Sequence, residues 1–393
     1  MSESAATSSA TATASTSTGT STATAAGATH TSSQATTQVG PRRIDEFLKE
    51  VLMKNGSDLH FMAGDPARIR LFGELQALRP DILPAPFVQE LLLEIMPRAA
   101  QMRLEEKHGA DFAYIIPGVS RFRVNVLRHL NGLGAVFRAI PSKALTLDQL
   151  NMPEAVRGLC RVNSGLILVT GKTGSGKSTS LAAMIDDINA RLKGHIVTIE
   201  DPIEFVHQRK SCLISQREIG VHTGSFSEAL QSALREDPDV ILVGELRDYE
   251  TMSIAVTAAE MGILVMGTLH TNGAAPTVDR MVNAFPADKQ PHVRAMLSTS
   301  LRGVISQQLI PRAGKPGRVA AMEILINTPA VANLIRQGKL DQLENTMQSG
   351  AAHGMRTMDS AIQELLDKSI ITGRDAYKKA MNKTKFEALK DAG

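Results

Sequence analysis

The stretch Gly171-Lys172-Thr173-Gly174-Ser175-Gly176-Lys177-Ser178 decides the fold of this chain. It has two glycines separated by four residues and followed by Lys and Ser, which is the pattern of a phosphate-binding loop. The apolar residues 166–169 lead into it as a strand, and a helix-compatible segment, 179–191, follows it. Glycines let the backbone curl so that several N–H groups point at one anion, and the start of the helix adds positive potential. We therefore expect the loop and Thr179 to bind a nucleoside triphosphate, with Lys177 on the β- and γ-phosphates and Ser178 on Mg²⁺.

Composition limits the class of protein. The 393 residues suffice for two or more domains, and 43% hydrophobic with 21% charged residues is typical of a globular chain. A net charge of +3, no Trp and three Tyr argue against a nucleic-acid partner, which would need a basic surface and stacking rings. Two cysteines, Cys160 and Cys212, cannot form a four-cysteine zinc site, so no zinc is expected. Free thiols and the lack of a secretion signal favour the cytoplasm.

The first 40 residues differ from the rest of the chain. Ser, Thr and Ala make up 31 of them, and no Lys or Arg occurs before Arg42. Such a segment buries too little apolar surface to offset its ordering entropy, so we expect 1–40 to be a disordered tail. No run of eighteen apolar residues occurs in the chain, so no membrane span is expected.

Hydrophobic periodicity divides the remaining chain into three regions. Residues 41–142 mix helices with short strands, residues 143–328 alternate strands and helices, and residues 329–393 are helical. The alternation predicts a sheet covered by helices on both faces, and hence an α/β fold. The expected helices are 44–54, 87–96, 179–191, 226–235, 249–260, 288–308, 330–337, 339–348, 357–368 and 374–381. The expected strands lie within 57–79 and at 112–116, 121–127, 135–140, 166–170, 195–200, 240–244, 263–268 and 318–326.

Three acids within five residues end one strand, in Thr198-Ile199-Glu200-Asp201-Pro202-Ile203-Glu204. Carboxylates at the carboxyl end of a strand point into the crevice where α/β sheets bind ligands. Hydrolysis of a triphosphate needs a carboxylate that orients or deprotonates the attacking water. The alternative interpretation is a solvated loop with a Pro turn, and without the phosphate-binding loop that alternative would be favoured.

Two further strands end in polar residues. Asp239-Val240-Ile241-Leu242-Val243-Gly244-Glu245 is an apolar strand that ends in an acid, the pattern that holds the water shell of Mg²⁺ beside a phosphate-binding loop. Val265 to Asn272 ends with His270 among polar residues, where it could sense the γ-phosphate through a hydrogen bond. Alone, each has an ordinary structural interpretation: a core strand with a surface acid, and a hydrogen-bonded histidine.

Arginines are a further group of candidates, because phosphoryl transfer builds negative charge that an arginine from another domain or subunit can stabilise. Arg121, Arg123 and Arg138 lie on expected strands of the first region, and Arg280 follows the histidine segment. A row of arginines on one strand face is more often a solvated face, so the residues alone do not select among them.

These segments together resemble the secretion/pilus traffic ATPases, and most closely the PilT-like branch of type IV pilus retraction motors. The resemblance covers about residues 44–381. The segments that carry it are Ser57-Asp58-Leu59-His60, the loop 171–178, the acidic segment 198–204, the segment 240–248 with Gly244-Glu245-Leu246-Arg247-Asp248, and the histidine segment 267–273. The set as a whole is highly specific, whereas only the loop is specific by itself.

The resemblance implies a PAS-like N-terminal domain over 41–142, a RecA-like P-loop NTPase core over 143–328 and a C-terminal helical region over 329–393. It also implies ATP hydrolysis with Mg²⁺. The site residues that it matches are Glu204 as the catalytic glutamate, Glu245 as the Walker B acid that serves the metal together with Ser178, His270 as the phosphate-sensing histidine, and Arg123, Arg138 and Arg280 as arginines that reach the nucleotide in the closed state.

Partners and location follow from the same resemblance. Motors of this kind are rings of six identical subunits at the cytoplasmic base of the pilus, where they engage an inner-membrane platform protein. Some work beside a second retraction ATPase. ATP turnover changes the angle between neighbouring subunits and drives pilin back into the membrane, which produces twitching motility.

One segment departs from the retraction branch, which usually carries Ala-Ile-Arg-Asn-Leu-Ile-Arg-Glu in its C-terminal helices. This chain has Ala330-Val331-Ala332-Asn333-Leu334-Ile335-Arg336-Gln337, and so lacks one arginine and the glutamate. Two alternatives to a retraction motor therefore stay open: a related pilus-assembly or type II secretion ATPase, and a nucleotide-gated accessory subunit of a retraction motor. The missing four-cysteine zinc module argues against the first, and the intact Lys177, Glu204 and Glu245 against the second.

Overall fold

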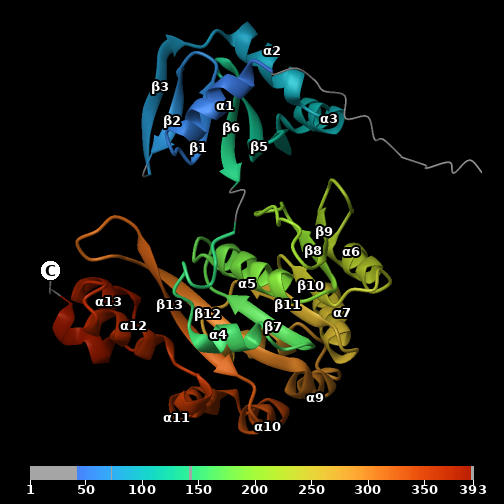
Figure 1. Cartoon of the computed structure of the whole chain (residues 1–393), viewed down its shortest axis with the longest axis vertical. Helices are drawn as coiled ribbons and strands as arrows, with labels where there is room; N and C mark the ends of the chain where they lie inside the picture. The colour runs from blue at the N-terminus through green and yellow to red at the C-terminus, as the bar shows by residue number, and fades with distance from the viewer. Residues whose placement is uncertain (1–41, 72, 141–143, 391–393) are drawn as a thin grey trace, which may run out of the picture. The chain divides into compact units, whose positions relative to one another are not determined.

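The computed structural model describes residues 42–71, 73–140 and 144–390. The expected tail, 1–40, lies outside them. Residues from Arg43 onward belong to one unit, in which two sheets follow each other along the chain (Figure 1). The boundaries predicted at 142 and 328 stay predictions. Within the described ranges, no helix is both long enough and apolar enough to cross a membrane.

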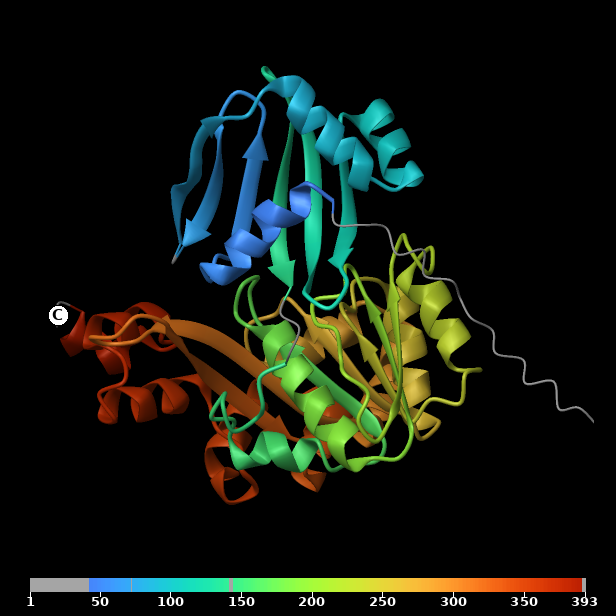
Figure 2. The same cartoon turned by 45° about the horizontal axis from the view of Figure 1, so that its top comes forward.

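The first sheet is antiparallel and has the strand order β3-β2-β1-β6-β5-β4. Its strands are β1 (Asp58–Met62), β2 (Pro66–Leu71), β3 (Glu74–Ile82), β4 (Gly109–Ile116), β5 (Ser120–His129) and β6 (Gly132–Ile140). Its helices are α1 (Ile44–Met53), α2 (Ala85–Ile95) and α3 (Arg98–Lys107), and α1 and α2 cross the same face in Figure 2. All three bury apolar side chains in one cluster with the strands.

The alternating burial along β5 shows how the two faces of this sheet differ. Phe122, Val124 and Val126 are fully buried under the helices, and alternate with more exposed polar residues, as the sequence predicts. Burial of each of these side chains stabilises the fold by about 1.5–3 kcal/mol. The face without helices therefore carries the charged residues of β5, including Arg121 and Arg123.

The second sheet has the strand order β13-β12-β7-β11-β10-β8-β9, in which only β13 runs antiparallel to its neighbour. The strands are β7 (Gly165–Thr170), β8 (His195–Glu200), β9 (Leu213–Glu218), β10 (Val240–Val243), β11 (Leu264–Leu269), β12 (Leu301–Pro311) and β13 (Arg318–Ile326). Helix α4 (Glu154–Leu159) precedes the first of these strands, and the helices between them are α5 (Lys177–Arg191), α6 (Phe226–Ala233), α7 (Tyr249–Glu260), α8 (Ala274–Asn283) and α9 (Gln290–Ser300).

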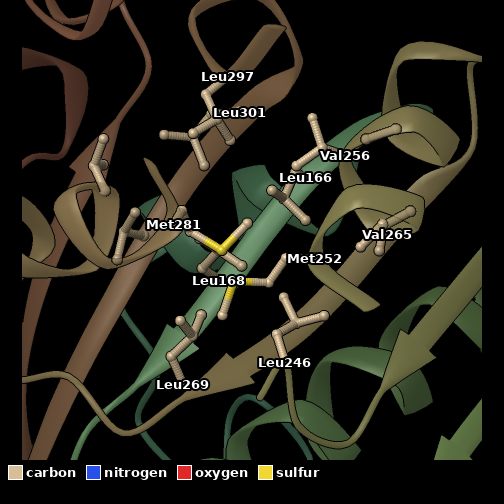
Figure 3. Packing of buried hydrophobic residues seen from close by; sticks show 14 of the residues in the cluster. Leu166, Leu168, Leu246, Met252, Val256, Val265, Leu269, Met281, Leu297 and Leu301 are labelled. Carbon is tan, nitrogen blue, oxygen red and sulfur yellow. The ribbon is translucent and has the colours of Figure 1, made fainter. Parts of the chain in front are cut away.

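Helices cover both faces of this sheet, as the alternation predicts. Strand β7 shows how: Leu166 and Leu168 pack with α6 to α9 in one cluster, shown in Figure 3, whereas Ile167 and Val169 pack with α4 and α5 in another. Because every residue of β7 is buried, the strand fixes the start of the loop that follows it.

The C-terminal region is helical, as expected. It contains α10 (Pro329–Gln337), α11 (Leu343–Ser349), α12 (Met358–Asp367) and α13 (Gly373–Lys379), with short 3₁₀ turns at Leu340–Gln342, Ala351–His353 and Lys383–Leu389. Three of these helices begin after a threonine, Thr328, Thr357 or Thr372, whose side chain accepts a hydrogen bond from the first turn.

The predicted helix over 288–308 is wrong in its second half. Helix α9 ends at Ser300, and 301–311 form β12, which pairs with β7 on one side and β13 on the other. The apolar residues Leu301, Val304, Ile305 and Leu309 of this segment recur at spacings of three and four residues, so it extends the helical pattern of α9 without a visible break. Four elements were also not predicted: α3, α4, α8 and β9.

Candidate nucleotide-binding site

The predicted phosphate-binding loop connects β7 to α5. Strand β7 ends at Thr170, and α5 begins at Lys177 directly after Gly176, whose φ is +91°. Gly171 has a φ of +139°, and a Cβ there would lie 2.4 Å from the carbonyl oxygen of Gln307. Only glycine satisfies both constraints, because other residues avoid this backbone region and would clash with β12. The loop is therefore curled against the neighbouring strand, with the start of α5 at its end.

The side chain of Gln307 in β12 holds this loop through hydrogen bonds. Gln307 is 1% exposed; its Nε2 donates to the Ser175 carbonyl at 2.6 Å, and its Oε1 accepts from Ser180 Oγ at 2.8 Å. One side chain thus joins the loop to the first turn of α5. No sequence pattern points to this residue, because it lies in the segment for which a helix is predicted.

Lys177 is turned back onto its own loop. Its Nζ donates to the carbonyls of Gly171 at 2.8 Å and Lys172 at 3.2 Å. Burial lowers the pKa of Lys177 below its ordinary value, against the opposing effect of the nearby Glu245 and Glu204 carboxylates. A phosphate in the loop would replace these carbonyls as its partner and favour the charged form.

The acidic segment begins at the carboxyl end of β8. Glu200 is 8% exposed, and its carboxyl group accepts hydrogen bonds from Thr198 Oγ1 at 2.7 Å and from the backbone N–H of Glu204 at 3.1 Å. Burial raises the pKa of Glu200, although these hydrogen bonds oppose the shift. Glu204 is exposed at the cavity, so the two acids differ: the Glu200 carboxyl group holds the loop, whereas the Glu204 side chain lines the cavity.

Glu245 and His270 meet between the ends of two neighbouring strands, β10 and β11. His270 Nε2 lies 3.3 Å from Glu245 Oε1, and Arg247 contacts the other carboxylate oxygen at 2.8 Å. Burial acts to raise the pKa of Glu245, but Arg247 and His270 outweigh it and hold that pKa below its ordinary value. Glu245 is therefore ionised at neutral pH.

A cavity of about 490 Å³ brings most of these residues together. The predicted site residues that line it are Thr173, Gly174, Gly176, Lys177, Ser178, Thr179, Glu204, Glu245, His270 and Arg138. Lining residues that the sequence did not single out include Thr268, Leu309 and Arg318. The predicted residues outside this lining are Gly171, Ser175, Arg123 and Arg280.

The candidate arginines have separate environments. Arg138 reaches the cavity while its Nε donates to buried Asp58 at 2.8 Å. Arg123 lies 3.9 Å from Asp111, and Arg280 contacts the Arg247 carbonyl at 3.4 Å. Their roles toward a nucleotide stay predictions.

Arg121 differs from the other arginines, because it forms an ion pair with Glu218 of β9. Both side chains are largely buried, which rules out the solvated-face interpretation for this residue.

A curled, glycine-rich loop between a buried parallel strand and a helix, facing carboxylates at neighbouring strand ends, defines a P-loop nucleotide-binding protein. This chain belongs to the Type II/IV secretion system protein family, whose model matches residues 33–369.

Individual relatives agree with this assignment. The chain is 51% identical over 337 residues to the "Type IV pilus retractation ATPase PilT" of Pseudomonas aeruginosa, covering 86% of this chain and 98% of the relative. It is 50% identical over 314 residues to a "Twitching motility protein" of Neisseria gonorrhoeae, covering 80% and 84%. A crystal structure of the pilus retraction motor PilT with bound ADP superposes with a TM-score of 0.83 at 43% identity, covering 89% of this chain and all of that one.

These comparisons confirm the family resemblance and the fold class expected from the sequence: an α/β protein with a RecA-like P-loop core, an N-terminal PAS-like domain and C-terminal helices. They leave the individual site residues and the domain boundaries as predictions.

Proposed function

We propose that this chain is the ATP-hydrolysing subunit of a motor that powers type IV pilus retraction, and thereby twitching motility. The observation that carries the proposal is the single cavity in which the loop lysine, Lys177, faces Glu204, Glu245 and His270. The names of the relatives, which are a pilus retraction ATPase and a twitching motility protein, supply the cargo.

Each residue has a distinct task in the proposed reaction. Loop N–H groups and Lys177 bind the phosphates of ATP. Glu204 orients a water and accepts its proton, the water oxygen bonds to the γ-phosphorus, and the bond from that phosphorus to the β–γ bridging oxygen breaks. ADP and inorganic phosphate result. His270 donates a hydrogen bond to the γ-phosphate and so distinguishes ATP from ADP.

The cavity also suits Mg²⁺, which is usually held by one or two protein oxygens together with phosphates and waters. Ser178 and Glu245 line the same cavity and supply a hydroxyl and an ionised carboxylate. When bound, Mg²⁺ would neutralise charge on the phosphates. Because Glu245 is already engaged by Arg247 and His270, we expect it to act on water molecules of the metal rather than on the metal itself.

Assembly and location extend the proposal. Six copies would form a homohexamer, in which subunit closure would bring Arg123 and Arg280 toward the nucleotide, and Arg138, which lines the cavity, would also reach it. The ring would act at the cytoplasmic base of the pilus, bound peripherally to an inner-membrane platform protein. A second retraction ATPase is a further proposed partner.

Two substitutions test the chemistry. Glu204→Gln keeps the size of the side chain but removes the proton acceptor, so ATP binding should persist while turnover falls at least a hundredfold. Lys177→Ala removes a charge-assisted phosphate contact and should weaken ATP binding itself. Both are measured with purified protein by magnesium-dependent phosphate release and by titration with a fluorescent ATP analogue. Unchanged turnover in Glu204→Gln would remove this residue from the catalytic role.

A deletion strain tests the direction of work. Loss of a retraction motor should leave excess surface pili and abolish twitching, whereas loss of an assembly ATPase should leave no pili. An accessory subunit is recognised differently: its deletion should weaken twitching only partly, and the Glu204→Gln variant should complement it. Complementation by Glu204→Gln would therefore overturn the proposal of a hydrolysing motor.

A further inference from the structure

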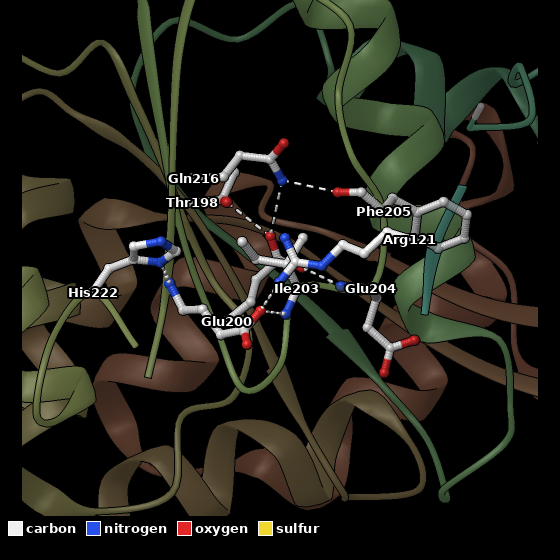
Figure 4. A network of polar contacts seen from close by, with 9 residues as sticks. Arg121, Thr198, Glu200, Ile203, Glu204, Phe205, Gln216 and His222 are labelled. Atoms are coloured by element: carbon white, nitrogen blue, oxygen red, sulfur yellow. Dashed lines mark hydrogen bonds and ion pairs between the residues drawn. The ribbon is translucent and has the colours of Figure 1, made fainter. Parts of the chain in front are cut away.

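We infer that the Arg121–Glu218 ion pair positions the loop that carries Glu204, so that the N-terminal domain sets the geometry of hydrolysis; the inference rests on the proposed function. Glu218 is the last residue of β9 and is 4% exposed. Its Oε2 accepts a hydrogen bond from the backbone N–H of Ile203 at 3.1 Å and also contacts Arg121 Nη2. Figure 4 shows Arg121, Ile203 and Glu204 within the same network of polar contacts.

Two carboxyl groups therefore hold two successive amides of the loop. Glu218 accepts from Ile203, and Glu200 accepts from Glu204. Glu200 and Glu218 are register partners at the ends of the neighbouring parallel strands β8 and β9, and the Ile219 N–H donates to the Glu200 carbonyl at 2.9 Å. The backbone of Glu204 is thus fixed relative to the sheet, and its side chain is aimed from that fixed point.

The charge of Glu218 explains why an arginine is needed. A buried carboxylate without a partner is costly, and it would turn toward water or take up a proton, weakening its hold on Ile203. Arg121 supplies the compensating charge, and the two side chains are only 13% and 5% exposed. The backbone N–H of Glu218 is itself fixed by His222 Nδ1 at 2.9 Å.

The Arg121–Glu218 ion pair joins the two sheets. Arg121 belongs to β5 of the first sheet, whereas Glu218, Ile203 and Glu204 belong to the second. Its Nε has no hydrogen-bond partner among the described residues, so the guanidinium is held mainly through the ion pair. A movement of β5 away from β9 would therefore release the carboxylate and, with it, the loop. Arg121 is a positioning residue in this scheme and does not touch ATP.

Turnover kinetics of the full-length ring test the inference through three variants. Arg121→Ala should lower kcat about tenfold to a hundredfold, as expected for a misplaced catalytic group, while KM and the affinity for a fluorescent ATP analogue change less than threefold. Arg121→Lys keeps the charge and should recover most of the loss. Arg128→Ala removes an exposed arginine from the same strand and should leave kcat unchanged. An equal loss in Arg121→Ala and Arg128→Ala would overturn the inference.

A second experiment separates this inference from the proposed function. Combined with Glu204→Gln, Arg121→Ala should cause no further loss of turnover, because both act on the same group. Independently of activity, hydrogen–deuterium exchange of the peptide spanning 201–206 should become at least tenfold faster in Arg121→Ala and stay unchanged in Arg128→Ala. Unchanged exchange would refute the positioning role even in an active protein. If the wild-type protein had no ATPase activity but Arg121→Ala still exchanged faster than wild type, the positioning role would stand and the proposed function would be refuted.

Discussion

Replacing Gln307 by Leu should loosen the phosphate-binding loop without touching any group that contacts phosphate. The change removes two hydrogen bonds, to the Ser175 carbonyl at 2.6 Å and from Ser180 Oγ at 2.8 Å. Both serines are buried, so the carbonyl and the hydroxyl would be left unpaired at a cost of about 1–3 kcal/mol each. We take about 2–4 kcal/mol for the pair, because the shape of the side chain is largely retained.

The assay measures where this cost appears. If the lost hydrogen bonds destabilise only the loop conformation that binds phosphate, ATP affinity should weaken roughly 30- to 1000-fold, since about 1.4 kcal/mol is a factor of ten. If the cost falls on folding, the unfolding midpoint Tm should drop instead. Both are measured on the same preparation, with Gln308→Leu as the control, because Gln308 makes only a 3.5 Å contact to the Lys379 carbonyl. If neither affinity nor Tm changed in Gln307→Leu beyond the control, the supporting role would be refuted.

Three further outcomes are expected. Glu323→Ala should lower the free energy of unfolding by about 2–4 kcal/mol, measured as a fall in Tm. The reason is that the buried Glu323 carboxyl group accepts hydrogen bonds from the first backbone N–H of α8 and the first of α12. Glu323→Gln should lower Tm less. Burial lowers the pKa of His207 to about 4, so below pH 6.5 the unfolded chain binds more protons than the folded one. As the pH is lowered from 6.5 to 4, Tm should therefore fall by the equivalent of at most about 3 kcal/mol of stability. His207→Gln should make Tm depend less on pH in this range. Ala332→Arg with Gln337→Glu should leave Tm and basal phosphate release unchanged while altering twitching.

Much of the second sheet follows from the sequence, because its strands are short apolar runs that end in distinctive polar residues. The strand before the loop and the strands ending near Glu204, Glu245 and His270 were all predicted to within one or two residues. Their convergence follows from one rule, that the carboxyl ends of parallel strands share an edge. The strand order cannot be derived in this way, since β12 lies next to β7 although more than a hundred residues separate them.

The residues that support the site were not predictable for a related reason. Gln307 and Arg121 act through partners that are distant in sequence, at Ser175 and Glu218. Their local sequences describe only a polar residue in an apolar segment and an arginine in an alternating strand. A pattern that repeats every two or four residues carries information about which face a side chain occupies, but none about the element that covers it.

The departure from the retraction branch at 330–337 falls within α10. The residues that anchor this helix, Val331 and Ile335, are fully buried against the core of the second sheet, and both stay apolar. Three positions differ: Val331 replaces Ile in the core, Ala332 is half-buried, and Gln337 is exposed and contacts Asn333 within the same helix. None of these residues lines the nucleotide cavity. Since Val331 keeps an apolar core residue and the changes at 332 and 337 spare the cavity, we infer that the two polar changes affect what α10 meets outside this chain, which is where force rather than hydrolysis would be altered.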